Sequence, residues 1–162
     1  MQTFLPYSTP ADCAAALDNK RLNKQILECY QILKVISTNG KAWRNHPAVL
    51  MWEGAENELW RYTMAMVNEA NHRGIKTENN LNNLNTLKSL YGKTWGDGQP
   101  VFAKTKESFN RTVITHRANL YRKDPIYYAH FSSAKTNKFN KPCCDRCQYY
   151  WATHKESVGA KK

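Results

Sequence analysis

The sequence predicts an all-α fold, a single compact domain of three main helices followed by a short tail that contains cysteine and histidine. Apolar residues recur every three or four positions in three long stretches, as they do on one face of an amphipathic helix. Proline, glycine and asparagine mark the ends of these stretches. No stretch shows the strict alternation of a β-strand above background. With 162 residues, 41% of them hydrophobic, the chain is long enough to bury one core.

The first helix is expected over residues 10–38. Residues 2–10 precede it as an extended arm interrupted by prolines. Thr9 has the side chain of an N-cap, and Pro10 suits the first helical position. Asn39-Gly40 supplies a C-terminal stop. The apolar face of this helix comprises Leu22, Ile26, Cys29, Leu33 and Ile36.

Two further helices are expected along the chain. One covers residues 47–73 and ends at an Arg-Gly pair, which is typical of a helix C-terminus. Residues 75–98 are rich in Asn and Gly and predict a loop with one short helix near 84–90. The third long helix fits residues 101–121, after which an Asp-Pro pair breaks the pattern. A polar linker, residues 132–140, follows.

The charge of the chain predicts an acidic partner. The formal net charge is +11 and the pI is about 9.5. From Lys104 to the end, 13 Lys and Arg stand against 4 Asp and Glu, whereas the first 103 residues hold 11 against 9. The basic half also carries aromatic residues, and aromatics among cations suit base stacking combined with phosphate contact. We therefore expect a nucleic acid partner, with a merely solvated tail as the alternative.

The tail, residues 132–162, contains a candidate zinc knuckle. Two of its cysteines have the C-x-x-C spacing of such sites, and a histidine follows. A structural zinc would hold together a segment too short to form its own apolar core. The alternative is free thiols in a reducing cytosol. Cys13 and Cys29 fit helix positions and are expected in the core. The candidate zinc ligands are Cys143, Cys144, Cys147 and His154, with His130 as an alternative fourth.

An ionic strip runs beside the apolar face of the first helix. On a helical wheel with Leu22 at zero, the strip contains Asp18, Arg21, Gln25 and Glu28. A carboxylate at the edge of a core is partly desolvated, which raises its pKa, while neighbouring cations lower it. Such a group could stabilise a forming cation and move protons. The simpler interpretation is that Arg21 and Glu28 are surface charges and that Asp18 and Arg21 form an ordinary i,i+3 pair.

Several motifs carry a family resemblance. They are MQTFLPY at residues 1–7, LDNKRLNKQ at 17–25 with Glu28, WRNHPAV at 43–49 with Met51 and Trp52, Arg73-Gly74, HRANL at 116–120, and RKDP at 122–125 with Tyr127 and Tyr128. Together these motifs resemble the pyrimidine-dimer DNA glycosylase (endonuclease V) family, in its broader bacterial and phage branch. The similarity covers roughly residues 1–130, a helical glycosylase-like domain that we place at 1–131.

The resemblance implies an all-α DNA-repair glycosylase that binds kinked, damaged duplex DNA and flips a nucleotide out. It implies catalysis by an N-terminal α-amine and by one glutamate of the first helix, a role that falls on Glu28. The amine attacks the sugar C1′, an imine forms, and β-elimination can nick the strand as an AP lyase. An α-amine suits this step because its ordinary pKa of about 7.7–8.0 lies below the roughly 10.4 of lysine.

Position 2 departs from the family pattern. Members expose a small residue after the initiator methionine is removed, whereas Gln2 is large and normally blocks that removal. The amine would then belong to Met1. Either this amine reaches the sugar, or Lys20 or Lys24 replaces it, or water attacks, or the activity has diverged. The alternative functions are a glycosylase or modifying enzyme for a non-canonical base and a non-catalytic DNA-binding protein with the same fold.

Basic side chains in the motifs are expected to contact DNA. Trp43 offers an aromatic surface that could replace lost base stacking. His116 lies on the apolar face of its helix, so it is either a DNA contact or a core histidine. The candidate DNA-binding residues are Arg21, Lys24, Arg44, His46, His116, Arg117, Arg122 and Lys123.

The chain is expected to act as a monomer on double-stranded DNA in a bacterial or phage-infected cytosol. No apolar run approaches the roughly 18 residues of a membrane span. The N-terminus lacks the charged and apolar regions of a signal peptide. No cofactor is expected for catalysis.

Overall fold

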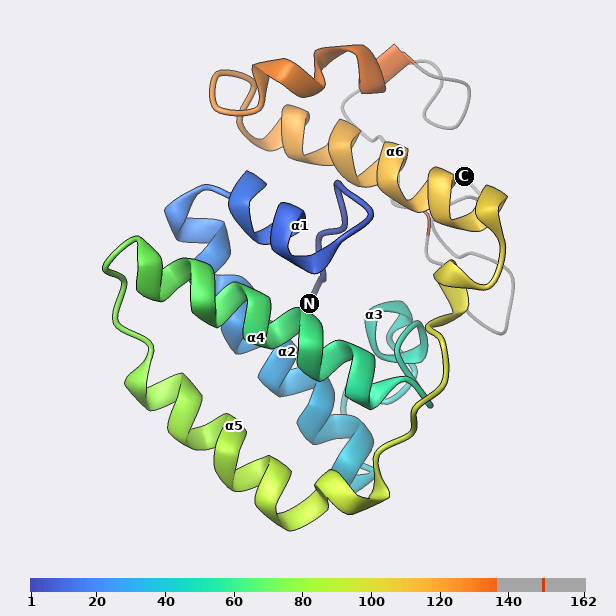
Figure 1. The fold of residues 1–162 in the computed structure, drawn as a ribbon. Coiled ribbons are helices and arrows are strands. Elements are labelled where there is room, and N and C mark those ends of the chain that lie inside the picture. Colours follow the sequence, from blue (N-terminus) through green and yellow to red (C-terminus); the bar gives the residue numbers. More distant parts are fainter. Residues whose placement is uncertain (137–149, 151–162) are drawn as a thin grey trace.

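The computed structural model describes residues 1–136 and Tyr150, without the side chains of 135 and 136. This part of the chain is all-helical, with no β-strand, which confirms the predicted fold class (Figure 1). The α-helices are α1 (Pro10–Ala16), α2 (Asn19–Thr38), α3 (Pro47–Leu50), α4 (Glu56–His72), α5 (Glu78–Tyr91) and α6 (Lys106–Lys123). The 3₁₀ helices are η1 (Gly92–Thr94), η2 (Val101–Ala103) and η3 (Ala129–Thr136). The prediction of three main helices was therefore too coarse.

The helix predicted over residues 10–38 is two helices. Leu17 and Asp18 have extended backbones, with ψ of 142° and 159°, and they separate α1 from α2. The break lets the side chain of Leu17 point into the core, where it is fully buried. The guanidinium of Arg73, at the end of α4, donates to the carbonyl oxygens of Leu17 and of the last turn of α1 at 2.6–3.2 Å. A cation distant in sequence therefore caps α1 and stabilises the break.

The helix predicted over residues 47–73 is also divided, into α3 and α4. The turn between them contains Gly54, whose φ of +83° lies in the left-handed region that favours glycine. The loop after η1 crosses this turn, and Gly98 donates its N–H to the carbonyl of Gly54 at 3.1 Å. A Cβ atom on Gly96 would lie 2.4 Å from that same oxygen. The close approach of two backbones therefore requires glycine here and prevents a continuous helix.

The remaining helix boundaries also differ from the predictions. α5 spans 14 residues, twice the length of the short helix expected near 84–90, and it buries Leu84 and Leu87. α6 begins later than predicted because Thr105 caps it, accepting the N–H of Ser108 at 3.1 Å. The first part of the predicted linker, up to residue 136, belongs to η3, which packs on α6.

The helices enclose one core. α2 packs between α4 and α5, α1 lies on α4, and α6 carries η3 on its outer side (Figure 1). Cys13 and Cys29 are fully buried, as predicted, and burial raises the pKa of both thiols to about 12. The largest buried side chains include Leu22, Ile26, Ile32, Leu33, Trp52, Leu59, Tyr62, Met66 and Tyr128.

The predictions of a zinc site and of no membrane span can be compared with the described residues only in part. The predicted zinc ligands Cys143, Cys144, Cys147 and His154 lie outside the described residues. Among those that are described, no three His, Cys, Asp or Glu side chains are grouped so that they could hold a metal ion. No helix in the same range has the length and apolar character needed to cross a membrane.

Candidate active site

The site is built on the N-terminal arm, residues 2–6, which is buried rather than extended into solvent. Gln25, on the inner side of α2, holds the arm with both ends of its amide. Its Nε2 donates to the carbonyl oxygen of Gln2 at 2.6 Å, and its Oε1 accepts the N–H of Phe4 at 2.9 Å. The side chain of Gln25 therefore pairs with the arm as a neighbouring strand would, and it fixes the first residues of the chain against α2.

Other elements anchor the rest of the arm. The hydroxyl of Tyr62 on α4 donates to the carbonyl oxygen of Phe4 at 2.5 Å. From α6, Nδ1 of His116 accepts the N–H of Leu5 at 2.9 Å, and Nε of Arg117 donates to the carbonyl oxygen of Pro6 at 2.6 Å. Because α2, α4 and α6 all hold the arm, Met1 has a fixed position.

Met1 lines a cavity of about 400 Å³ beside α2. Its size lies within the roughly 300–1,000 Å³ typical of ligand sites. Four basic side chains and one carboxylate line it, so it suits an anion. Burial and the neighbouring cations lower the pKa of Lys123, in keeping with a positive field. The lining residues are Met1, Gln2, Phe4, Lys20, Arg21, Lys24, Glu28 and Lys123.

Glu28 is the carboxylate of this cavity. It is 9% exposed, and burial raises the pKa of its carboxyl group. The positive α-amine of Met1, the ammonium of Lys24 and the backbone N–H of Gln2 oppose that shift without cancelling it. The Nζ of Lys24 lies 4.0 Å from Oε1 of Glu28. The predicted combination of a partly desolvated glutamate and nearby cations is therefore present, and Met1 lines the same cavity.

His46 lies within electrostatic range of the N-terminus. Burial, and then the positive charge of the N-terminus, lower the pKa of its imidazole. Its Nδ1 accepts the N–H of Ala48 at 3.0 Å, so the side chain caps α3 and has a fixed orientation. The structure thus places Met1 and Glu28 in the lining of one cavity, whereas His46 is not part of that lining.

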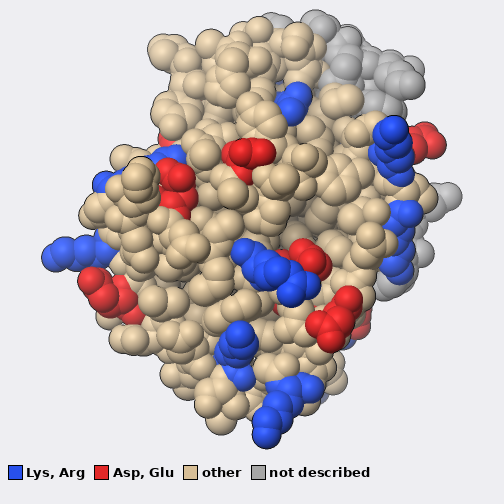
Figure 2. Space-filling model, in the orientation of Figure 1, with Lys and Arg blue, Asp and Glu red and all other residues tan. Residues whose placement is uncertain are grey.

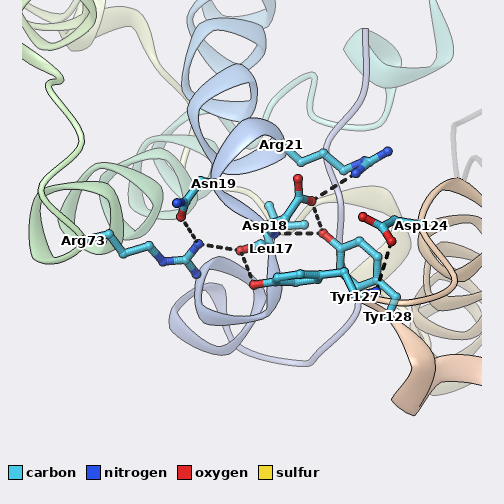
Figure 3. Close-up of polar contacts among 8 residues, drawn as sticks. All are labelled: Leu17, Asp18, Asn19, Arg21, Arg73, Asp124, Tyr127 and Tyr128. Carbon is cyan, nitrogen blue, oxygen red and sulfur yellow. Dashed lines mark hydrogen bonds and ion pairs between the residues drawn. The ribbon is translucent and has the colours of Figure 1, made fainter.

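A network of hydrogen bonds fixes Arg21 at the rim (Figure 3). The hydroxyl of Tyr128 donates to the carboxylate of Asp18 and accepts the N–H of the same residue at 2.9 Å. That carboxylate also receives Nη1 of Arg21 at 3.2 Å. Burial tends to raise the pKa of Asp18, but the bonds from Tyr128 and Arg21 outweigh it and the net shift is downward. The network therefore ties the segment after α6 to the first turn of α2 and orients Arg21.

We expect Tyr128→Phe to destabilise the fold by about 1–2 kcal/mol, because one hydroxyl serves two bonds and its loss leaves buried groups unpaired. The network lowers the pKa of Asp18 in the folded protein. Its contribution to the free energy of unfolding is therefore complete above the ordinary pKa of an aspartate, and it is lost as the pH falls through the lowered pKa of Asp18 in the folded state. Urea unfolding at pH 7 and pH 3 measures both effects. Tyr127→Phe is the matched control, because Tyr127 is 46% exposed and, among the described residues, its hydroxyl makes one long contact, 3.4 Å, to the carbonyl oxygen of Leu17. Equal destabilisation by the two variants would contradict this assignment.

Other candidate DNA contacts are placed differently. His116 is fully buried and burial lowers its pKa to about 3, so the imidazole is neutral and inaccessible. Its proposed DNA contact is corrected to a core role, which is the second interpretation that the sequence had left open. Arg117 lies 4.8 Å from the ring of Tyr7 and serves the arm. Arg44 is paired with Glu53 at 2.5 Å. Arg122 donates to Asn119 on its own helix.

Sequence reasoning assigned no role to Gln25, Tyr62 or Tyr128. Gln25 was placed on the ionic strip, and a polar residue between an apolar face and a charged one is a signal that could have marked it. Its partners, however, are backbone groups of the arm, which no periodicity reveals. Tyr128 is more than 100 residues away from Asp18, so nothing local predicts their bond.

A second cavity, of about 270 Å³, lies on the other side of the arm between Tyr62 and the loop before η2. Its lining contains no Lys or Arg and includes the carboxylates of Glu58 and Asp97, so it is unsuited to phosphate. The face in Figure 2 shows acidic and basic side chains interspersed, without a continuous basic patch. The cavity beside α2, with its four basic side chains, is therefore better suited to an anionic substrate than this one.

The described part of the chain is an all-helical domain whose buried arm leads to a basic cavity. Met1 and the partly desolvated Glu28 line this cavity. These features define a class of protein in which an amine and a carboxylate can act together on an anionic substrate. The chain belongs to the pyrimidine dimer DNA glycosylase family, whose model matches residues 1–83. The matched part contains the arm and Glu28, whereas Lys123 and Tyr128 lie beyond it. Neither a curated protein nor a solved structure matched the chain.

Proposed function

We propose that the protein is a DNA-repair glycosylase that acts on pyrimidine dimers in duplex DNA and nicks the resulting abasic strand as an AP lyase. The observation that carries the proposal is the position of Glu28. It is buried in a cavity that Met1 also lines, together with four basic side chains, and the charge of the α-amine acts on its carboxyl group. Family membership supports the same activity.

The chemistry begins with the amine of Met1 in its neutral form. Its lone pair attacks C1′ as the glycosidic bond breaks. The base takes the bonding electrons and a proton, and it stays joined to the neighbouring pyrimidine through the cyclobutane ring. The nitrogen loses a proton and the sugar ring opens, which gives an imine. Loss of a 2′ proton then expels the 3′ phosphate by β-elimination, and water hydrolyses the imine to restore the amine.

Glu28 serves these steps in two ways. Its carboxylate stabilises the positive charge that develops on the sugar and on the imine nitrogen. It also accepts and returns protons, a task for which a raised pKa is favourable because the group then titrates nearer to neutral pH. The basic side chains of the cavity, Arg21 and Lys24 among them, hold the phosphates on either side of the flipped nucleotide.

The burial of Gln2 supports the amine of Met1 as the nucleophile. Its side chain is 7% exposed and both of its amide atoms are buried, while Met1 still lines the cavity. Lys24 is the alternative, but its side chain is 69% exposed and lies on the outer side of Glu28. The large residue at position 2 is therefore compatible with an active terminal amine.

Two measurements test the proposal. Purified protein should cut a glycosidic bond at the dimers of ultraviolet-irradiated duplex DNA. Because the cut base stays joined to its neighbour by the cyclobutane ring, base release is scored after photoreversal has split the dimer. An abasic duplex treated with borohydride should give a covalent adduct on the N-terminal peptide by mass spectrometry. Lys24→Ala should leave the adduct in place. An adduct on a peptide containing Lys20 or Lys24 would reassign the nucleophile. Binding without base release, on irradiated DNA and on DNA with modified bases, would leave a DNA-binding protein without glycosylase activity.

A further inference from the structure

The side chain of Gln2 is a buried polar group that the chemistry above does not use. It lines the cavity beside α2, although it is only 7% exposed. Both polar atoms of its carboxamide, Oε1 and Nε2, are buried, and neither has a hydrogen-bond partner among the described residues. Buried side-chain amides are nearly always paired, so an amide that is unpaired at both atoms requires an explanation.

Stability does not account for this amide. An unpaired buried donor or acceptor destabilises a fold, and an apolar side chain of the same length would avoid that cost. The main chain of Gln2, in contrast, is paired on both sides. Its carbonyl oxygen accepts Nε2 of Gln25 at 2.6 Å, and its N–H donates to the carboxylate of Glu28. Gln2 therefore combines a fixed backbone with a side-chain amide that serves nothing in the fold.

The amide can turn into the cavity without losing a hydrogen bond. Its two polar atoms are covered in the described conformation, so contact with a ligand requires rotation of the side chain from one staggered rotamer to another. The cavity of about 400 Å³ offers room for that rotation. A paired amide would first have to break its bonds, whereas the amide of Gln2 has none to break among the described residues. A ligand in the cavity therefore gains both bonds without competition from the protein.

The hydrogen-bonding pattern of a carboxamide identifies the class of ligand. Its oxygen only accepts hydrogen bonds and its nitrogen only donates them, so both are satisfied by a group that offers a donor and an acceptor side by side. The edge of a nucleobase has this pattern, and glutamine pairs with such an edge through two bonds. A phosphate offers acceptors alone and would leave Oε1 unpaired. The amide of Gln2 is therefore suited to a base and not to a phosphate.

The rest of the cavity lining is consistent with a nucleotide. The uncharged side chains of the lining, those of Met1, Gln2 and Phe4, all come from the N-terminal arm. The charged side chains come from α2 and from the last residue of α6. A nucleotide likewise consists of an uncharged, flat base and a charged phosphate. The arm therefore suits the base, and the basic side chains of the helices suit the phosphates.

We propose that Gln2 turns its carboxamide into the cavity and pairs with the hydrogen-bonding edge of the base of the nucleotide that enters. This inference rests on the proposed function, since it assumes that a flipped nucleotide occupies the cavity. Gln2 is then a specificity-determining residue, because a nucleotide without that edge leaves the amide unpaired. The large residue at position 2 has a use of its own at the site.

The test measures binding and not catalysis. The probe is a duplex in which a tetrahydrofuran abasic site lies opposite thymine, because an unpaired base costs least to flip. The comparison duplex carries difluorotoluene, which has the shape of thymine without its hydrogen-bonding edge. Wild-type protein should bind the thymine duplex about 10-fold more tightly, as two hydrogen bonds allow. Gln2→Met keeps the length of the side chain and a large residue at position 2, and it should reduce the preference to less than about twofold. Any difference in stacking between the two bases affects both proteins equally.

Stability separates this role from a structural one. Gln2→Met removes two unpaired buried atoms, so its Tm should be unchanged or raised while the preference is lost. Gln31→Met, the same substitution at an exposed position of α2, should alter neither. An unchanged preference in Gln2→Met, or no preference in the wild type, would overturn the inference. A lowered Tm with weaker binding of both duplexes would also overturn it, in favour of a structural role. Base release from irradiated DNA, measured separately, shows whether the proposed function stands when this inference fails.

Discussion

Glu28→Gln is expected to reduce base release by about 10²-fold or more while binding of damaged duplex is retained. The amide keeps the size of the carboxylate and can still accept the N–H of Gln2, but it carries no charge and does not take up a proton. Loss of a positioned general acid or base costs about 10²–10⁴-fold in rate. Single-turnover base release, with affinity measured separately on the same DNA, checks the prediction.

The same variant should not lose stability at neutral pH. Burial raises the pKa of Glu28 in the folded protein, so the folded state binds its proton more tightly than the unfolded state does. The contribution of Glu28 to the free energy of unfolding therefore falls as the pH rises from its ordinary pKa of 4.5 through its raised pKa in the folded protein. Above that raised pKa, the buried ionised carboxylate destabilises the fold. Glu28→Gln removes that penalty, and thermal unfolding at pH 4 and pH 7 should show the larger gain at pH 7.

Glu56→Gln is the matched control. Glu56 is likewise buried, but it lies on α4 and accepts the N–H of Gly96 at 3.0 Å, a bond that an amide oxygen can also accept. Base release should remain near the wild-type rate. If both variants lost activity equally, or if Glu28→Gln released bases normally, Glu28 would have no special part in the chemistry.

The candidate site shows which parts of a structure a sequence can predict. Periodicity placed Glu28 on a strip at the edge of the core because a helix converts spacing into direction. The same periodicity could not place the break at Leu17 and Asp18. That break depends on Arg73, from the end of α4, and on the hydroxyl of Tyr128, after α6. Local pattern predicts which face of a helix is buried, whereas tertiary partners decide where the helix is interrupted.

The N-terminal arm illustrates the same division. Its prolines predicted an extended segment; residues 2–5 belong to no helix or strand, and residues 6–9 form a bend before α1. Its burial was not predictable, because the groups that satisfy its backbone, such as Gln25 and His116, come from separate helices. A buried backbone without strand neighbours needs side-chain partners, and no spacing rule names them.

Gln25→Leu is therefore expected to be the most destabilising single change at the site. Leucine is of similar size and suits the buried position, but the carbonyl of Gln2 and the N–H of Phe4 would lose their partner. Each unpaired buried group costs about 1–3 kcal/mol, so the free energy of unfolding should fall by roughly 2–6 kcal/mol. For a chain of this size, that corresponds to a decrease in Tm of roughly 5–20 °C.

The loss of stability in Gln25→Leu should be concentrated in the N-terminal arm. This local effect distinguishes it from general damage to the core. Hydrogen exchange at Phe4 should accelerate at temperatures where the variant is still folded, and activity should fall further than the folded fraction, because the amine of Met1 is no longer held beside Glu28. Gln31→Leu is the control, the same substitution at an exposed position of α2, and should change stability by less than about 0.5 kcal/mol. If Gln25→Leu behaved like Gln31→Leu, the arm would be held by its remaining contacts, and the amine would owe its position to Tyr62 and His116 instead.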